Sequence, residues 1–308
     1  MARRVDNPAF HRNYGFFSED EQQAINKATV AIAGAGGDGF QLGYKLAMMG
    51  VGTLKIADPE VFEIENSNRV FGATKSHIGQ NKAKVFREMV SQLPSPPRVV
   101  IFEEGVTEEN ITEFVSGADL VLDESELTYP QVGVMLAREA RKVGIPELLV
   151  MNIGFAGVAT SFHPYRGVTF EHMIGMSAET PLSEITYGNV TIDRFLAYLP
   201  EYGDLATLNE VKKGAPLPSI TQGVDVASAV GSTEVFLHLT AHIHNNRRTP
   251  TWAPRMRYMD SYTNKSGTIR FPRISYYHRA VCMAIRSKLG LNPVASYHVS
   301  DRNRRTKK

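Results

Sequence analysis

The sequence of 308 residues contains one cysteine, Cys282, and no long apolar run. A single cysteine cannot form an internal disulfide or a cysteine-rich zinc site, so no structural zinc is expected. No apolar stretch approaches the roughly 20 residues that cross a bilayer. The start, MARRVDNPAFHRNYGFF, also lacks the apolar core of a signal peptide. These absences predict a cytoplasmic protein with no membrane partner.

Net charge is also small, at a formal +2. The last residues, DRNRRTKK at 301–308, carry more basic than acidic side chains, so the rest of the chain is slightly acidic. We interpret 291–308 as a flexible, solvated basic tail. Contact of this tail with RNA, such as a tRNA, stays open as an alternative.

The first half alternates between strand and helix patterns. A capping box at Ser18 and Glu21 begins the helix of an N-terminal arm, 1–28. Strands are predicted at 29–33, 53–57, 98–102, 119–123 and 147–152, and helices at 37–50, 80–93, 108–116 and 129–143. This order predicts an α/β, Rossmann-like fold with a mostly parallel sheet and helices on both faces. A ligand should then bind beyond the carboxyl ends of the strands.

The second half, 154–290, has a different pattern but is expected to belong to the same globular unit as the nucleotide-binding half, 29–153. One strand or a hairpin is predicted at 154–163, and a long buried helix at 223–246. Antiparallel strands at 255–262 and 266–273 should extend the sheet. Between the strand at 154–163 and the helix at 223–246, the crossover segment (164–220) has weak periodicity. This is typical of a functional crossover or lid rather than an ordinary connection.

A glycine-rich stretch, VAIAGAGGDGF at 30–40, follows the first strand. Gly34, Gly36 and Gly39 have the GxGxxG spacing of a dinucleotide-binding turn, where bare backbone can approach phosphate. Asp58 comes 19 residues after Gly39 and could bind both hydroxyls of a ribose. Asp38 is unfavourable beside phosphate, so we interpret it as a helix-start residue. These residues alone fit NAD and ATP equally.

Polar and basic residues after Asp58 favour ATP. The segment contains Asn66, Asn68, Arg69, Lys75 and Lys82. A redox cofactor does not need such a cluster, whereas arginine and lysine can neutralise the charge of a triphosphate and of departing pyrophosphate. Asp123 ends the next strand at the same edge, where it could hold Mg²⁺. The alternative is a set of surface salt bridges and a helix cap.

Four motifs together, GAGGDG, ADPEVFEIENSNR, IGQNKA and LVLDES, resemble the ThiF/MoeB/HesA superfamily, relatives of the ubiquitin-activating enzymes. The resemblance covers roughly residues 12–262. It implies ATP- and Mg²⁺-dependent adenylation of the C-terminal carboxylate of a ubiquitin-like or sulfur-carrier protein, or of a peptide, with release of pyrophosphate.

The resemblance also assigns roles to single residues. It implies that the nucleotide is lined by Gly34, Gly36, Gly37 and Gly39. Asp58 would hold the ribose, and Asp123 the Mg²⁺. The phosphates would be contacted by Asn66, Arg69 and Lys82, and Asn68 would also belong to the cofactor-binding residues. Arg12 matches an arginine finger that reaches into a partner subunit, which implies a homodimer.

The sequence departs from this family in two places. Glu60 replaces a second aspartate, which keeps the charge. The crossover segment has no cysteine and the CxxC zinc motifs are missing, so a thioester step is doubtful and the acyl acceptor should lie outside this chain. A carboxylate nucleophile is already ionised near neutral pH, so no general base is needed.

Three other readings stay open. An NAD-dependent oxidoreductase explains the glycines and Asp58 but not the basic cluster. A non-catalytic binding partner could retain the fold without the activity. Cys282 with His278, or His238 with His242, could be reactive or bind metal, but packed side chains explain them better.

Overall fold

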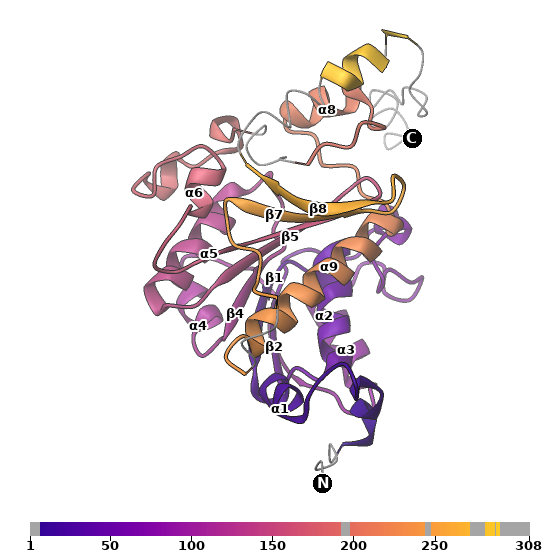
Figure 1. Ribbon diagram of the computed structural model, residues 1–308, viewed down its shortest axis with the longest axis vertical. Coiled ribbons are helices and arrows are strands. Elements are labelled where there is room, and N and C mark those ends of the chain that lie inside the picture. Colours follow the sequence, from indigo (N-terminus) through magenta and orange to yellow (C-terminus); the bar gives the residue numbers. More distant parts are fainter. Residues whose placement is uncertain (1–6, 192–197, 244–247, 272–280, 287, 290–308) are drawn as a thin grey trace.

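The computed structural model describes residues 7–191, 198–243, 248–271, 281–286 and 288–289. Its centre is an eight-stranded sheet in the order β3-β2-β1-β4-β5-β6-β7-β8, with helices on both faces (Figure 1). The basic tail, His244 and His278 lie outside the described residues.

The first five strands in the sheet are parallel, as predicted. They are β3 (Arg98–Phe102), β2 (Thr53–Ala57), β1 (Thr29–Ala33), β4 (Leu120–Asp123) and β5 (Glu147–Ile153). Apolar residues fill them on both faces, which is typical of parallel strands between two helix layers. Their carboxyl ends lie at one edge of the sheet.

The remaining strands are antiparallel and extend the same sheet. Strand β6 (Ala156–Phe162) pairs with β5 along its seven residues, so 154–163 contains one strand and not a hairpin. Next come β7 (Arg255–Asp260) and β8 (Lys265–Arg270), which form the predicted closing hairpin. The structure thus confirms the predicted fold class.

One face of the sheet is covered by α1 (Glu19–Lys27), α2 (Gly37–Met49), α3 (Lys82–Ser91) and α9 (Thr221–Thr240). The capping box of Ser18 and Glu21 begins α1. Asn81 caps α3, so this helix begins two residues later than predicted. Helix α9 approaches the sheet closely, because a Cβ at Gly157 of β6 would lie 2.4 Å from the backbone of Ala227.

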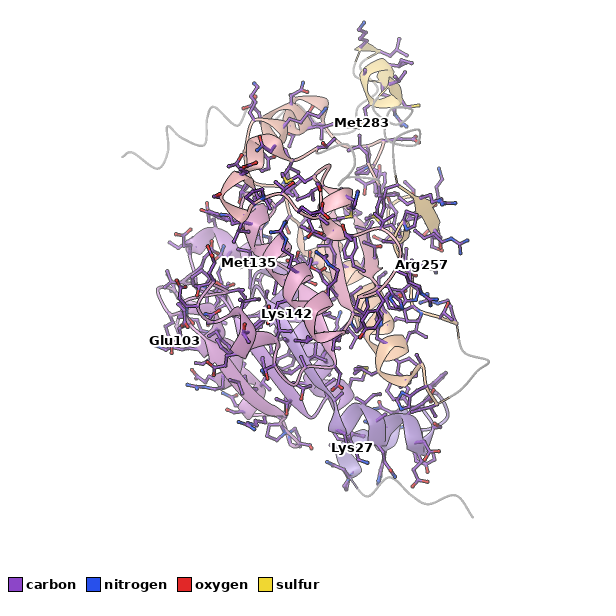
Figure 2. The ribbon with its side chains drawn as sticks, turned by 90° about the vertical axis from the view of Figure 1, so that its left-hand side faces the viewer. Lys27, Glu103, Met135, Lys142, Arg257 and Met283 are labelled. Carbon is purple, nitrogen blue, oxygen red and sulfur yellow. The ribbon has the colours of Figure 1, made fainter. Side chains whose placement is uncertain are left out.

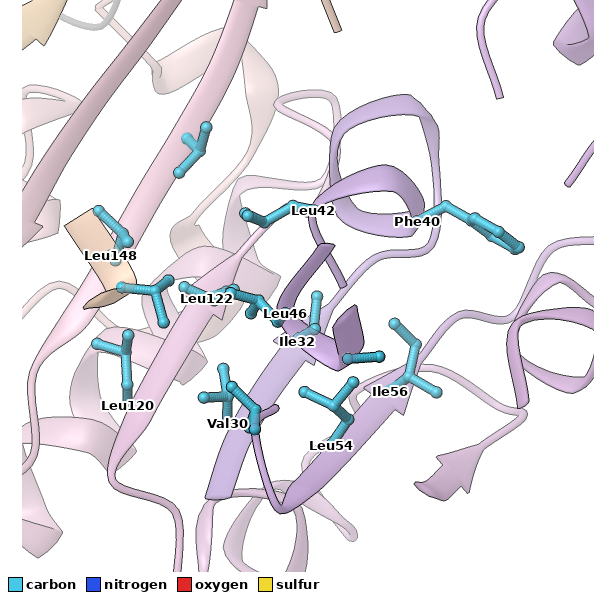
Figure 3. Packing of buried hydrophobic residues seen from close by; sticks show 14 of the residues in the cluster. Val30, Ile32, Phe40, Leu42, Leu46, Leu54, Ile56, Leu120, Leu122 and Leu148 are labelled. Carbon is cyan, nitrogen blue, oxygen red and sulfur yellow. The ribbon is translucent and has the colours of Figure 1, made fainter. Parts of the chain in front are cut away.

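The core under α2 is formed by short aliphatic side chains of neighbouring strands. Figure 3 shows these residues together: Val30, Ile32, Leu54, Ile56, Leu120, Leu122 and Leu148 from the strands, with Phe40, Leu42 and Leu46 from α2. The opposite face is covered by α4 (Ile111–Val115) and α5 (Pro130–Val143). Burial of these side chains, each worth roughly 1.5–3 kcal/mol, fixes α2 over the ends of the parallel strands.

In the described parts of the crossover segment, 164–191 and 198–220, the elements are short: α6 (Phe170–Met173), η3 (Leu182–Glu184), η4 (Tyr187–Asn189) and α8 (Leu205–Lys212). Their apolar residues form a separate core with β5, β6 and β7. Elements of three to eight residues are too short for the periodicity that marks a helix in sequence. None of the helices in the described ranges is both long and apolar enough to cross a membrane.

Candidate functional site

A cleft of about 570 Å³ lies at the carboxyl ends of β1, β2 and β5. Its walls are the glycine turn (residues 34–39), the loop after β2, the loop between β4 and α5, and parts of the crossover segment. Tyr187, Val211 and residues 215–219 of the crossover segment also line it, and the Tyr187 hydroxyl donates to the carbonyl of Val211. The cleft is therefore where the sequence predicts a bound ligand.

The four predicted glycines all line the cleft, but for different reasons. Gly34 has a φ of +111°, and a Cβ there would lie 2.2 Å from the carbonyl oxygen of Glu124. A Cβ at Gly39 would lie 2.1 Å from the carbonyl oxygen of Gly34. At Gly37 the nearest neighbour is a Val224 methyl, whereas a Cβ at Gly36 would meet no atom within 4 Å. Gly36 thus leaves open space beside the first turn of α2.

Asp58 holds the glycine turn to the end of β2. Its Oδ2 accepts from the Ala35 amide at 2.6 Å, and its Oδ1 accepts from the Glu60 amide at 2.8 Å. Burial raises the pKa of this carboxyl, and the charge of Lys82 opposes that shift. Asp58 lines the cleft, at the position predicted for a ribose-binding acid.

Among the described residues, Lys82 and Arg69 are the two basic ones that line the cleft. The Lys82 side chain is only 5% exposed, and its ammonium pairs with the half-exposed carboxylate of Glu60. Arg69 donates through Nη1 to the Glu65 carbonyl at 3.0 Å and to Asn68 Oδ1 at 2.9 Å. Lys82 is thus paired with an acid that also lines the cleft, whereas these two bonds of Arg69 go to uncharged groups.

The two asparagines have different surroundings. Asn66 is buried, lines the cleft, and its Oδ1 accepts from the Glu63 amide at 2.9 Å. Asn68 is not among the residues that line the cleft; its Nδ2 donates to the Ser219 carbonyl at 3.1 Å. Asn68 therefore links Arg69 to the end of the crossover segment. Lys75 is exposed and lies away from the cleft walls.

Asp123 lies behind the cleft. Its side chain is buried, and its Oδ1 accepts from the Ser125 amide at 3.0 Å and from the Ser125 hydroxyl at 2.6 Å. A Cβ at Gly133 of α5 would lie 2.6 Å from Asp123 Oδ2, so the carboxylate faces α5. Burial raises its pKa to about 6, against the Ser125 hydrogen bonds. The next acids, Glu124 and Glu126, do line the cleft.

Asp38 is in the first turn of α2 but does not cap it. Its Oδ2 accepts from the backbone amide of Asn152 at 2.8 Å and from Asn152 Nδ2 at 2.7 Å. These bonds fasten α2 to the end of β5. Burial raises the pKa of Asp38 to about 7, although the Asn152 bonds and the charge of Arg69 oppose that rise.

Among the cleft residues that sequence reasoning missed are Asn152, Glu124 and Tyr187. Asn152 and Glu124 could have been found, because each is a polar residue at or just after a predicted strand end. No signal in the sequence marks Tyr187, which reaches the cleft only through the packing of the crossover segment.

Arg12 does not reach the cleft of its own chain. It is exposed in η1 (Pro8–Asn13), whose Phe10 ring lies near Gly50 at the far end of α2. Thirteen helical residues separate the two ends of α2 by roughly 20 Å. In Figure 1 the described chain begins at the lower end, near α1, and α8 lies at the upper end.

The structure gives little support to reactive or metal-binding roles for the histidine and cysteine side chains. His238 is half-buried and bonds Ser161 Oγ through Nε2 at 2.7 Å, and desolvation lowers its pKa to about 3. His242 lies in the turn after α9, so the two do not share a helix face. Cys282 is a half-buried free thiol. Among the described residues no three His, Cys, Asp or Glu side chains are grouped as a metal site.

Comparison with known proteins places this chain in a family. The sequence model of the ThiF family matches residues 10–281. A tRNA threonylcarbamoyladenosine dehydratase of Bacillus subtilis (strain 168) is 29% identical over 148 residues, which is 48% of this chain and 57% of the relative. The sulfur carrier protein ThiS adenylyltransferase of Escherichia coli (strain K12) is 29% identical over 138 residues, or 45% and 54%.

A third relative, the SAMP-activating enzyme E1 of Haloferax volcanii, is 29% identical over 163 residues, or 53% of this chain and 60% of the relative. The chain thus spans less than two thirds of each of these relatives. Among solved structures, E. coli MccB crystallised with ATP superposes with a TM-score of 0.64 and 15% identity, covering 89% of this chain and 73% of MccB. At that identity the likeness establishes the fold.

Proposed function

Because the chain belongs to the ThiF family, we propose that it binds ATP in the cleft and adenylates the C-terminal carboxylate of a protein or peptide. A carboxylate oxygen attacks the α-phosphorus, the bond to the bridging oxygen breaks, and pyrophosphate leaves. The products are an acyl-adenylate and pyrophosphate. A reaction that consumes ATP also agrees with the cytoplasmic location that the sequence predicts.

The observation that carries this proposal is the placement of Lys82 and Arg69 on the walls of a cleft floored by bare glycine backbone. Phosphates can approach the first-turn amides of α2 next to Gly36, where the helix dipole favours negative charge. Lys82 and Arg69 can then exchange their present partners for phosphate oxygens. Fixed cations that meet charge as it develops on the phosphates are the main source of catalysis in such a reaction.

A divalent cation fits this cleft because acids outnumber bases there. Two basic residues face eight carboxylates along its walls, namely Asp38, Asp58, Glu60, Glu63, Glu65, Glu104, Glu124 and Glu126. Mg²⁺ would screen the phosphates from these acids. The sequence assigns it to Asp123; that residue does not line the cleft, and its carboxylate would have to turn from α5 towards it. As a prediction, Asp123→Ala abolishes activity if the assignment is right and leaves it unchanged if another acid holds the metal.

Nucleotide binding separates the leading proposal from its alternatives. A fluorescent ATP analogue should bind, and ATP with Mg²⁺ should displace it while NADH does not. Tight NADH binding without ATP binding would favour an NAD-dependent oxidoreductase. A non-catalytic partner would bind nucleotide without ATP–pyrophosphate exchange when its carboxylate substrate is supplied. A co-purifying acyl-adenylate, found by mass spectrometry, would support the enzyme directly.

The substrate class is the finer part of the proposal. One relative is named for adenylylating the sulfur carrier ThiS and another for activating SAMP, and MccB has been crystallised with MccA. We propose a protein or peptide with a free C-terminal carboxylate, entering below the crossover segment. A small protein ending in Gly-Gly, encoded beside this chain, would be the first substrate to assay.

A homodimer would complete the site, because Arg12 can reach only the cleft of another copy. Exposed apolar side chains support this arrangement: Phe16 is 80% exposed, and the exposed Phe71 ring contacts Tyr44, four residues before the exposed Met48 on α2. Mixing inactive Arg12→Ala with inactive Lys82→Met subunits should restore part of the activity, since one of the two cleft types then holds both residues. No recovery in a dimer proven to have exchanged subunits would contradict this.

A tRNA substrate is the second candidate, and one surface favours it. Arg255 and Arg270 lie directly opposite each other on β7 and β8, with Arg257 on the same face. None of the three forms an ion pair within the described residues, and like charges at such short range are unfavourable without an anion. Figure 2 places Arg257 on the opposite side of the molecule from Glu103. Salt-sensitive tRNA binding, lost when Arg255 and Arg270 become glutamine, would test this.

A further inference from the structure

Three oxygen atoms at the cleft have no hydrogen-bond partner within the described part of the chain. They are Asp38 Oδ1 in the first turn of α2, Glu124 Oε1 just after β4, and Asn152 Oδ1 at the end of β5. All three residues line the cleft, and the three oxygen atoms themselves are buried. A buried acceptor without a partner costs about 1–3 kcal/mol, so three together call for a ligand.

The three residues converge on one place. Asp38 accepts both hydrogen bonds from Asn152 through its other oxygen, so the two side chains are in direct contact. Gly39 follows Asp38, and a Cβ there would lie 3.0 Å from Glu124 Cβ. The carboxylates of Glu124 and Asp38 are near enough to repel each other. Glu124 has no hydrogen bond from its carboxylate to any described residue, although it is held against the glycine turn.

These three oxygen atoms determine which kind of ligand would suit them. All three atoms are acceptors and two belong to carboxyl groups, which repel phosphate oxygens when they are ionised and which a cation would hold in the ionised form. Among the described residues no cation is hydrogen-bonded to these three oxygen atoms: Lys82 pairs with Glu60, and Arg69 donates to Asn68 and the Glu65 carbonyl, although its charge lowers the pKa of Asp38. A set made only of oxygen atoms suits a hard divalent cation, and it lacks the nitrogen or sulfur that zinc prefers.

We propose that Asp38, Glu124 and Asn152 form a binding site for Mg²⁺ or Mn²⁺ beneath the glycine turn. The cation bridges helix α2 to the ends of β4 and β5, one residue from the backbone that faces the phosphates. It binds without nucleotide. Its function in positioning ATP rests on the proposed adenylation, whereas the site itself does not.

Mn²⁺ binding to the full-length, nucleotide-free protein, followed by electron paramagnetic resonance, tests the site. Wild type should bind one Mn²⁺, and Mg²⁺ should displace it. Asp38→Asn and Glu124→Gln, which keep shape and remove charge, should each weaken binding by about tenfold or more. Glu104→Gln removes an exposed carboxylate from the same cleft and should leave binding within about twofold.

Several outcomes would overturn the proposal: no Mn²⁺ binding without nucleotide, equal binding by wild type and both variants, or a loss confined to Asp123→Asn. If the three acceptors instead bind an ammonium or amide group of the substrate, no Mn²⁺ should bind without nucleotide, which is the first of these outcomes. Displacement of an ATP analogue, measured on the same samples, keeps the two proposals apart. Normal ATP binding with unchanged Mn²⁺ binding in the variants refutes the cation site alone, and Mn²⁺ binding without ATP binding refutes the adenylation alone.

Discussion

Replacing Gly36 by alanine should weaken ATP binding and leave the fold intact. A Cβ at this position meets no protein atom within 4 Å, so the folded chain has room for a methyl group. Gly36 is the N-cap of α2, where alanine is less favourable than glycine, and this should lower the free energy of unfolding by about 1 kcal/mol or less. The same methyl group would occupy the open space through which phosphates reach the first-turn amides.

The loss of affinity can be estimated from the contacts that the methyl group prevents. A hydrogen bond from a backbone amide to a charged phosphate contributes about 1.5–3 kcal/mol. Losing one such bond weakens binding by about tenfold to a hundredfold, since 1.4 kcal/mol corresponds to a factor of ten. Titration with a fluorescent ATP analogue measures the affinity, and urea unfolding measures the stability.

Gly39→Ala is the matched variant, because its Cβ would lie 2.1 Å from the Gly34 carbonyl oxygen. Backbone must move there, so this variant should lose about 2 kcal/mol or more of stability. If Gly36→Ala binds ATP as tightly as wild type, the glycine turn does not hold the phosphates. If Gly36→Ala loses as much free energy of unfolding as Gly39→Ala, the folded chain has no room for a methyl group at position 36.

Three further predictions concern charge. Lys82→Met should slow pyrophosphate exchange by about a hundredfold to a thousandfold. The control, Lys84→Met, breaks only the exposed pair with Glu103 and should leave the exchange rate unchanged. Equal exchange rates in the two variants would contradict the role of Lys82. Because His238 has a pKa of about 3 in the fold, the unfolded chain alone takes up its proton below pH ~6.5, so stability should fall as pH drops towards 3, by up to about 1.4 kcal/mol per unit. An unchanged slope in His238→Gln, followed by urea unfolding at several pH values, would rule this out. Glu171→Gln should cost about 3–5 kcal/mol, because the fully buried Glu171 pairs with Arg138 and Arg141; the exposed pair of Glu210 is the control, and Glu210→Gln should change stability by less than about 0.5 kcal/mol.

Much of the parallel half could be predicted from sequence because its signals are local. Strands β1, β2 and β3 have the predicted bounds, since each is a short apolar run between turn residues. Helix α3 begins at Lys82 because Asn81 provides a cap, which places the lysine at the cleft. The crossover segment could not be assigned in this way, because its short helices are stabilised by a second core and not by their own pattern.

The sequence by itself determined which residue types follow the strands. It thereby placed the glycine turn, Asp58 and Lys82 at one edge of the sheet. Only the tertiary structure decided where the neighbouring acids point. Asp123 and Glu124 are consecutive, yet one faces Ser125 and α5 and the other lines the cleft, because successive strand residues project to opposite faces and packing against α5 selects the face. Asp38 and Asn152, 114 residues apart, meet only because α2 packs across the end of β5. Contacts between distant segments depend on how whole elements pack, and no local pattern in the sequence specifies them.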